Sequence, residues 1–286
     1  MNVVRTVAEL QRARAALAGS VGFVPTLGAL HAGHASLVNA ARDGCESVVA
    51  SVFVNPTQFG PNEDFTRYPR NEAADLAMLE SLGVDLAFLP SVDEMYPPTA
   101  TTFVDVGRLG EVLEGAARPG HFRGVATVVT KLFDMVQPDR AYFGQKDGQQ
   151  SVVVKRLVRD LALPVEIVIC PTVREPDGLA LSSRNRYLKP EERAQAPALY
   201  YALQAASAAA ADGERSADKL RALMHDALAP ATLGKPDYVS IADAETLEEL
   251  SVLDRPALAS LAVRFPSARL IDCQPLAISG VESRTS

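Results

Sequence analysis

The sequence of 286 residues contains no tryptophan, four histidines and three cysteines. The cysteines, Cys45, Cys170 and Cys273, lie far apart and form no CxxC pair. This spacing argues against a disulfide framework and against a zinc site built from cysteines, and it fits a reducing compartment. We therefore expect a cytoplasmic protein.

The sequence also lacks an excess of positive charge. It has 28 basic and 35 acidic side chains, for a net charge of -7. The balance is similar along the chain, with 15 basic and 19 acidic groups in residues 1–172 and 13 and 16 in residues 173–286. A general nucleic-acid binder needs a basic field, so we expect no nucleic-acid partner.

Residues 15–41 contain no charged side chain, yet they are not typical of a membrane span. Pro25, four glycines and two histidines interrupt this run, and lipid would penalise the broken backbone and the polar rings. The N-terminus likewise lacks an apolar stretch followed by a cleavage site for export. We expect no membrane partner, and we interpret the uncharged run as a buried strand that leads into a turn.

Short apolar runs alternate with helical patterns through the first part of the chain. The expected strands are 21–25, 47–54, 84–90, 101–106, 139–143 and 165–170, and the expected helices are 34–43, 71–83, 124–136 and 147–162. This alternation is typical of a parallel sheet that is covered on both faces. We predict an α/β fold, with a Rossmann-like doubly wound parallel sheet over residues 1–172 that binds nucleotide.

The composition changes after Pro171. A polar loop leads into an alanine-rich helix at about 191–211 and a second helix at 216–228, followed by strand candidates at 236–243, 258–265 and 268–273. A chain of this length commonly forms two domains. We predict that residues 173–286 form a second, smaller α+β domain that acts as a lid.

The densest motif is PTLGALHAGH, residues 25–34, between the first long strand and its helix. Gly28 and Gly33 permit a tight turn, and the amides of a helix N-terminus favour phosphate. His31 and His34 add donors that can follow charge as it develops on phosphate oxygens. The plainer alternative is a turn with one buried and one surface histidine. A metal site would need a third ligand, and no Cys, Asp or Glu lies near the pair, so we predict no metal ligands.

Three further blocks follow in order: FVNPTQFGPNEDFTRYPR (53–70), YFGQKDGQQ (142–150) and PTVREPDGLALSSRNRYL (171–188). Together with PTLGALHAGH they resemble the pantoate–β-alanine ligase (pantothenate synthetase) family, within the nucleotidyltransferase superfamily whose HIGH-type signature here reads HAGH. The resemblance covers residues 21–190. The chain departs from the usual family sequence at three positions: Leu27 replaces Met, Gln145 replaces Glu and Gly148 replaces Tyr.

The resemblance implies ATP-dependent condensation of (R)-pantoate with β-alanine. The products would be pantothenate, AMP and pyrophosphate, formed through a pantoyl-adenylate intermediate. Mg²⁺ is expected with the triphosphate, held largely by phosphate oxygens and water. The family also implies a homodimer.

The resemblance further implies a set of site residues. The catalytic set would be His31, His34, Lys146, Ser182, Ser183 and Arg184. The ATP site would be formed by Pro25, Thr26, Leu27, Gly28, Gly33, His34, Gly144, Lys146, Asp147, Val173, Leu181, Ser182, Ser183 and Arg184. The pantoate site would be formed by Leu27, Gln58, Phe59 and Gln150.

For two groups of residues the sequence leaves two alternative roles open. Tyr68 and Arg70 fit either the phosphate side of the site or the surface, whereas Arg118, His121 and Arg123 would either bind pantoate or order the lid.

Three other functions compete with the ligase. Another small-molecule nucleotidyltransferase would share HAGH but would not explain the paired glutamines. A tRNA synthetase would need a basic RNA surface. A catalytically inactive nucleotide-binding regulator would keep the fold, although the intact histidines and Lys146 argue against it.

Overall fold

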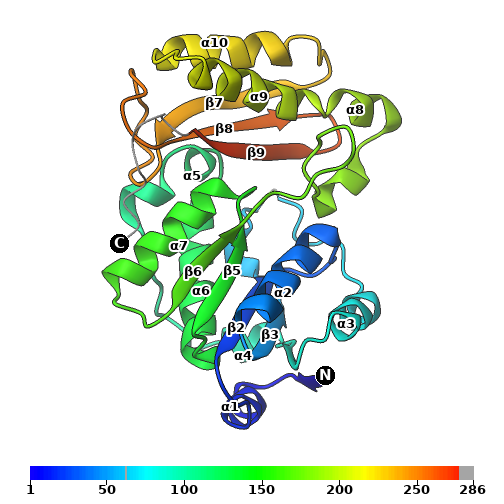
Figure 1. The fold of residues 1–286 in the computed structure, drawn as a ribbon. Helices are drawn as coiled ribbons and strands as arrows, with labels where there is room; N and C mark the ends of the chain where they lie inside the picture. Colours follow the sequence, from blue (N-terminus) through cyan, green and yellow to red (C-terminus); the bar gives the residue numbers. More distant parts are fainter. Residues whose placement is uncertain (62, 277–286) are drawn as a thin grey trace. The chain divides into compact units, whose positions relative to one another are not determined.

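Six parallel strands form the sheet of the first part of the chain in the computed structural model, which describes residues 1–61 and 63–276 (Figure 1). The strands are β1 (Asn2–Val4), β2 (Val21–Thr26), β3 (Ser47–Val52), β4 (Leu86–Phe88), β5 (Arg140–Gly144) and β6 (Glu166–Cys170), in the spatial order β1-β4-β3-β2-β5-β6. The apolar, β-branched runs at β2 and β3 are buried along most of their length, as a parallel sheet with two covered faces requires. The predicted Rossmann-like sheet is confirmed.

The strand order reverses between β2 and β5. From β2 the chain proceeds through β3 and β4 on one side of the sheet, and β5 and β6 lie on the other side. Open parallel sheets bind ligands outside the carboxyl ends of their strands at such a reversal. We therefore expect the ligand site at the segments that follow β2 and β5.

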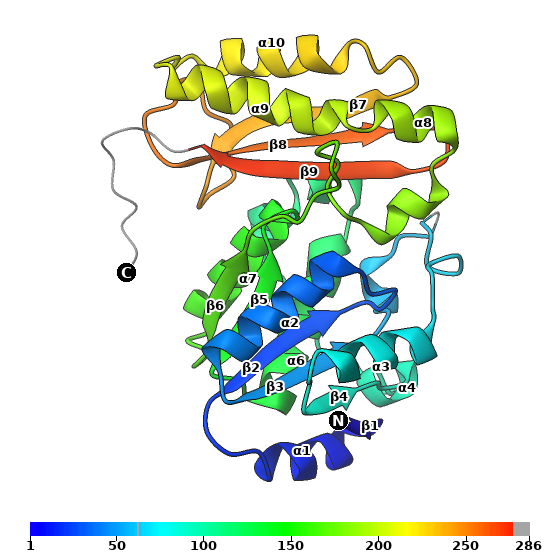
Figure 2. The ribbon, with the colours of Figure 1, turned by 45° about the vertical axis from the view of Figure 1, so that its right-hand side comes forward.

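Helices cover both faces of this sheet, as Figure 2 shows for α2 and α6. Phe23 of β2 packs edge-on against Phe133, whereas the next residue, Val24, joins Val38 in a different part of the core. Successive strand residues point to opposite faces, so β2 is buried between the two helices. The helices of this part are α1 (Val7–Ala15), α2 (Ala32–Gly44), α3 (Glu72–Ser81), α4 (Val92–Met95), α6 (His121–Val136) and α7 (Gly148–Asp160), with short 3-10 turns η1 (Pro56–Gln58) and η2 (Gly107–Gly110).

The strand predicted at 101–106 is wrong. The segment has no regular structure, and the amide of Val104 donates to Thr127 Oγ1 at 2.9 Å instead of to a neighbouring strand. The side chain of Phe103 is 44% exposed and lies under the guanidinium of Arg123, 4.2 Å from the ring centre. β-branched and aromatic residues favour a strand only where a sheet edge is within reach, and here α6 supplies the partner.

The later part of the chain contains a three-stranded antiparallel sheet, β7 (Lys235–Asp243), β8 (Ala257–Arg264) and β9 (Arg269–Leu276), in that order. Its helices are α8 (Pro190–Gln195), α9 (Ala198–Ala211) and α10 (Ala217–Leu228), and a 3-10 turn η3 (Ser183–Tyr187) precedes them. The predicted α+β architecture is confirmed. The single helix predicted at about 191–211 is divided into α8 and α9, and Pro197, which has no amide hydrogen to donate, stands at the break.

The chain divides into two compact units. Unit 1 comprises residues 1–111, 118–144 and 153–171, and unit 2 comprises residues 112–117, 145–152 and 172–286. The short helix α5 (Glu114–Ala117) joins unit 2 because Glu114 pairs with Arg269 at 2.7 Å and its amide donates to Gln149. The division predicted from the sequence, 1–172 and 173–286, does not include this exchange of segments. In the described residues, no helix combines the length and apolar character needed to cross a bilayer.

Helix α6 approaches η1 closely at Gly124. A β-carbon at this position would overlap the carbonyl of Thr57 and come within 2.7 Å of Gln58 Cα. Neither contact can be relieved by a side-chain rotation, because both involve backbone atoms.

We therefore expect Gly124→Ala to lower the free energy of unfolding by about 1–3 kcal/mol through overpacking. Gly60→Ala is the matched control, since its β-carbon would meet nothing closer than Glu63 Cγ at 3.7 Å. Its effect should stay within about 1 kcal/mol. Urea unfolding of both variants measures the difference, and equal stabilities would contradict the close approach.

Candidate active site

The turn after β2 is held by a buried carboxylate. Asp75 of α3 is 3% exposed and accepts hydrogen bonds from the amides of Ala29 at 2.9 Å and Leu30 at 2.8 Å. The backbone has positive φ at Gly28 (82°) and at Ala29 (52°), a conformation that is unfavourable for alanine without support. Charge-assisted hydrogen bonds to two successive amides supply that support.

The sequence interpretation missed Asp75. A signal was available, because Asp75 and Leu79 are four residues apart and both lie on the buried face of α3. A carboxylate on an apolar helix face needs compensating donors, but the spacing alone does not say which donors.

The two histidines of the motif cap helix α2. His31 is the N-cap, and its Nδ1 accepts from the amide of Gly33 at 3.1 Å; Nδ1 of His34 accepts from the amide of His31 at 3.3 Å. The ring centres are 4.1 Å apart. A backbone amide can only donate, so in each neutral ring the hydrogen resides on Nε2. The helix start thereby presents two imidazole Nε2–H donors, while the amides of His31 and Gly33 are used to orient the rings.

This turn and Gly144 lie at the same edge of the sheet. β2 pairs in parallel with β5, so the motif that follows β2 and Gly144 at the end of β5 both adjoin the reversal of strand order. Within unit 1 the residues predicted for the ATP site or the catalytic set that adjoin this reversal are Pro25, Thr26, Leu27, Gly28, His31, Gly33, His34 and Gly144.

The amide orientation of Gln58 follows from its neighbours. Oδ1 of Asn55 accepts from the amide of Thr57 at 3.3 Å, and Nδ2 of Asn55 donates to the carbonyl of Gly124 at 3.1 Å. Since that Nδ2 also lies 3.0 Å from the side chain of Gln58, the facing atom must be Oε1. The arrangement commits the side-chain oxygen of Gln58 to Asn55.

Phe59 belongs to an aromatic cluster with Phe65 and Tyr68, with ring centres 5.4 and 5.8 Å from its own. Tyr68 is 7% exposed, so it is not a surface residue. Arg70 donates to the carbonyls of Tyr68 and Phe65, at 3.2 and 2.9 Å. These contacts indicate that Tyr68 and Arg70 stabilise the conformation of the loop at 59–70.

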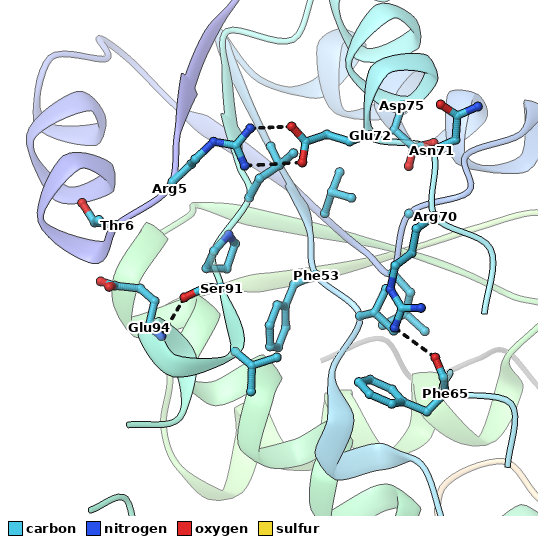
Figure 3. A pocket seen from close by; sticks show the side chains of 17 residues that line it. Arg5, Thr6, Phe53, Phe65, Arg70, Asn71, Glu72, Asp75, Ser91 and Glu94 are labelled. Carbon is cyan, nitrogen blue, oxygen red and sulfur yellow. Dashed lines mark hydrogen bonds and ion pairs between the residues drawn. The ribbon is translucent and has the colours of Figure 1, made fainter. Parts of the chain in front are cut away.

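A pocket of about 470 Å³ lies behind the turn (Figure 3). Leu27 and Gly28 line it, but neither His31, His34, Gln58 nor Phe59 does. Its charged side chains are engaged in the fold, as the labelled ion pair between Arg5 and Glu72 illustrates. Of the residues expected to bind ligand, the pocket therefore includes Leu27 and Gly28 but not the histidines or the residues that follow β3.

Unit 2 carries the remaining predicted residues. Nζ of Lys146 lies 3.3 Å from Asp147 Oδ1, and the lysine side chain is 19% exposed. The carbonyl of Val173 accepts from the amide of Leu181 at 3.0 Å, which places these two residues side by side. Oγ of Ser182 accepts from the amide of Arg184 and caps η3. The further predicted residues of this unit are Gln150, half-buried on α7, and Ser183, buried on η3.

The two departures beside Lys146 share one partner, Cys273. Its Sγ donates to the carbonyl of Gln145 at 2.8 Å, and a β-carbon on Gly148 would lie 2.5 Å from the same sulfur and 2.8 Å from Leu258 Cδ2. Burial raises the pKa of Cys273 to about 12, so the thiol keeps its hydrogen for this bond. In this chain the position of Gly148 has no room for a larger side chain.

In the part of the chain that the structure describes, no three His, Cys, Asp or Glu side chains gather as metal ligands. The groups that the structure places at the start of α2 are imidazole donors. Such groups, at a helix start on the switch point of a parallel sheet, bind phosphate. The fold and site define a Rossmann-like α/β protein that handles nucleotides.

Comparison with known proteins narrows this class. The chain belongs to the pantoate-beta-alanine ligase family, whose model matches residues 2–275. A pantothenate synthetase from Chloroflexus aggregans is 62% identical over 273 residues, which cover 95% of this chain and 98% of the relative. The chain is therefore a pantothenate-forming ligase.

Solved structures agree with this assignment. The structure of pantothenate synthetase from Thermus thermophilus superposes on this chain with a TM-score of 0.91 at 55% identity. The match covers 96% of this chain and 99% of the Thermus chain. The ligase from Francisella tularensis, complexed with beta-gamma ATP and beta-alanine, has a TM-score of 0.79 at 33% identity and covers 96% of this chain and 97% of its own.

The role of Asp75 can be tested through stability. Asp75→Ala leaves two buried amides without an acceptor, at about 1–3 kcal/mol each, and Asp75→Asn retains one acceptor oxygen and should lose roughly half as much. Asp93→Asn, at an exposed position in the first turn of α4, is the control and should change little. Urea unfolding gives the three free energies, and a wild-type value for Asp75→Ala would refute the assigned role.

Proposed function

We propose that the chain forms pantothenate in two steps. In the first, the carboxylate of (R)-pantoate attacks the α-phosphorus of ATP, the bond to the β-phosphate oxygen breaks, and pantoyl adenylate and pyrophosphate result. In the second, the amine of β-alanine attacks the acyl carbon, loses a proton, and AMP leaves. The observation that carries this proposal is the capped start of α2, with two imidazoles whose Nε2–H donors are set by the backbone.

The first step needs stabilisation of charge more than it needs a nucleophile. Negative charge shifts onto phosphate oxygens as pyrophosphate departs, and donors that are fixed in advance stabilise it most effectively. In this proposal His31 and His34 serve that purpose together with Lys146 and the Ser182–Arg184 turn. Asp147 and Gly144 would bind the ribose, and Val173 and Leu181 would line the adenine.

The pantoate site uses Gln58 as its defined donor. Its NH₂ group matches the oxygens of a hydroxy acid, because Asn55 occupies the amide oxygen. Leu27 and Phe59 would supply apolar contact for the methyl groups of pantoate, and Gln150 would supply a second amide. The half-buried position of Gln150 is compatible with this role.

Three further features complete the proposal. Mg²⁺ would enter as part of the MgATP substrate, held by phosphate oxygens and water. The protein would act as a homodimer, as its family resemblance suggests. It would work in the cytoplasm, because its free, separated cysteines fit a reducing compartment.

The reaction is tested with ATP, Mg²⁺ and pantoate, with and without β-alanine. Without β-alanine we expect one pyrophosphate per site and little free AMP; with it, AMP and pantothenate should form in equal amounts. A nucleotidyltransferase that stops after one transfer would release an adenylylated product without needing β-alanine. AMP formation that ignores either substrate would contradict the ligase.

We expect Lys146→Ala and His34→Ala each to slow adenylate formation by about 10²–10³-fold, the cost of losing one preorganised donor. Lys155→Ala and His225→Ala are matched controls on exposed helix positions and should keep wild-type rates. Single-turnover release of pyrophosphate measures the step, and circular dichroism checks that the variants fold. Near-normal rates would remove Lys146 or His34 from the catalytic set.

A further inference from the structure

A chain of three side chains ends on the backbone of Gln58. The carboxylate of Glu63 accepts two hydrogen bonds from Arg118, one from Nε at 2.8 Å and one from Nη2 at 2.6 Å. Nη1 of Arg118 lies 3.2 Å from Nε2 of His121, and Nδ1 of His121 lies 2.8 Å from the carbonyl oxygen of Gln58. All of these residues belong to unit 1.

The protonation of this chain follows from the partners. A guanidinium can only donate, so Nε2 of His121 accepts; a carbonyl can only accept, so Nδ1 carries the hydrogen. His121 is therefore a neutral ring in the opposite tautomer from that of His31 and His34. Burial opposes ionisation of Glu63, but the hydrogen bonds and charge of Arg118 outweigh it and lower the pKa of the carboxyl, which keeps the pair ionic.

Four of the five N–H donors of Arg118, and both ring nitrogens of His121, are engaged within the protein. Arg118 uses Nε and Nη2 on Glu63, Nη1 on His121, and Nη2 again on the carbonyl of Gln58 at 3.3 Å. Both ring nitrogens of His121 are also engaged, and the ring is 9% exposed. This leaves the backbone of Gln58, rather than a substrate, as the group on which the chain acts.

Gln58 is thus fixed twice, by different elements. Asn55 orients its side-chain amide, and His121 with Arg118 holds its carbonyl from the start of α6. A displacement of the main chain by 1 Å would carry the NH₂ group away from a bound ligand, and such misplacement can cost about 10²-fold in rate. The backbone contacts therefore bear directly on what the side chain can bind.

We propose that His121 and Arg118 are positioning residues for pantoate: they hold the main chain of Gln58 so that its amide donors meet the substrate, and neither side chain touches it. This inference rests on the proposed role of Gln58 as the pantoate donor. It differs from both roles that the sequence leaves open for these residues, direct binding of pantoate and ordering of the lid, because the group they hold is the main chain of Gln58.

The test uses the half-saturating concentrations of pantoate and ATP in the complete reaction. His121→Ala should raise that of pantoate by about 10-fold, the effect of one lost hydrogen-bonded contact, and leave that of ATP within about 2-fold. His121→Asn places an amide donor near the position of Nδ1 and should recover most of the loss. His225→Ala is the matched control. Arg118→Lys, which keeps the charge but not the fork, provides the same readout if His121→Ala does not fold.

A double-mutant cycle separates action through Gln58 from a general structural role. If His121 acts through Gln58, adding His121→Ala to Gln58→Ala should change the pantoate value little. Additive losses, or equal losses for pantoate and ATP, would overturn the proposal. A wild-type pantoate value in Gln58→Ala would refute the role of Gln58 and this inference with it, while the ligase reaction itself would stand on pantothenate formation by the wild type.

Discussion

The buried carboxylate of Asp75 is the interaction on which the rest of the site depends. It holds the two amides that follow Gly28 and so stabilises a turn with positive φ at Ala29. That turn sets where α2 begins and brings His31 to its N-cap. The backbone amides of α2 then set the tautomers of both imidazoles. A single carboxylate on another helix thus supports the turn from which the two imidazoles project.

The same principle, polar groups paired before substrate arrives, recurs at Gln58. Its amide oxygen is occupied by Asn55, and its carbonyl is held from α6, which the absence of a side chain at Gly124 allows to approach. Because the oxygens are committed, the proposed pantoate site uses the NH₂ group of Gln58. Preorganised donors of this kind lose little entropy when the substrate binds, and they favour charge that develops later.

Two of the three departures from the usual family sequence are connected in the structure, although they look independent in the sequence. Gln145 and Gly148 both contact Cys273, whose thiol donates to the carbonyl of the first and fills the space beside the second. The net charge of -7 does not indicate whether the chain binds ATP. The positive groups expected to serve ATP are few and local, and net charge describes solubility and broad partners.

The sequence by itself determined the α/β class, the α+β character of the second part, most helices and strands, and the family, because periodicity and ordered motifs are local properties of the chain. The same local signals failed at 101–106, where a strand-like composition has no sheet edge to join. Only the tertiary structure decided the hydrogen-bond partners of Asp75, Arg118 and Cys273. Their partners lie far away in the sequence, as Asp75 and Ala29 do at a separation of 46 residues. A buried polar side chain shows that it needs a partner, but which partner it has depends on how the elements pack.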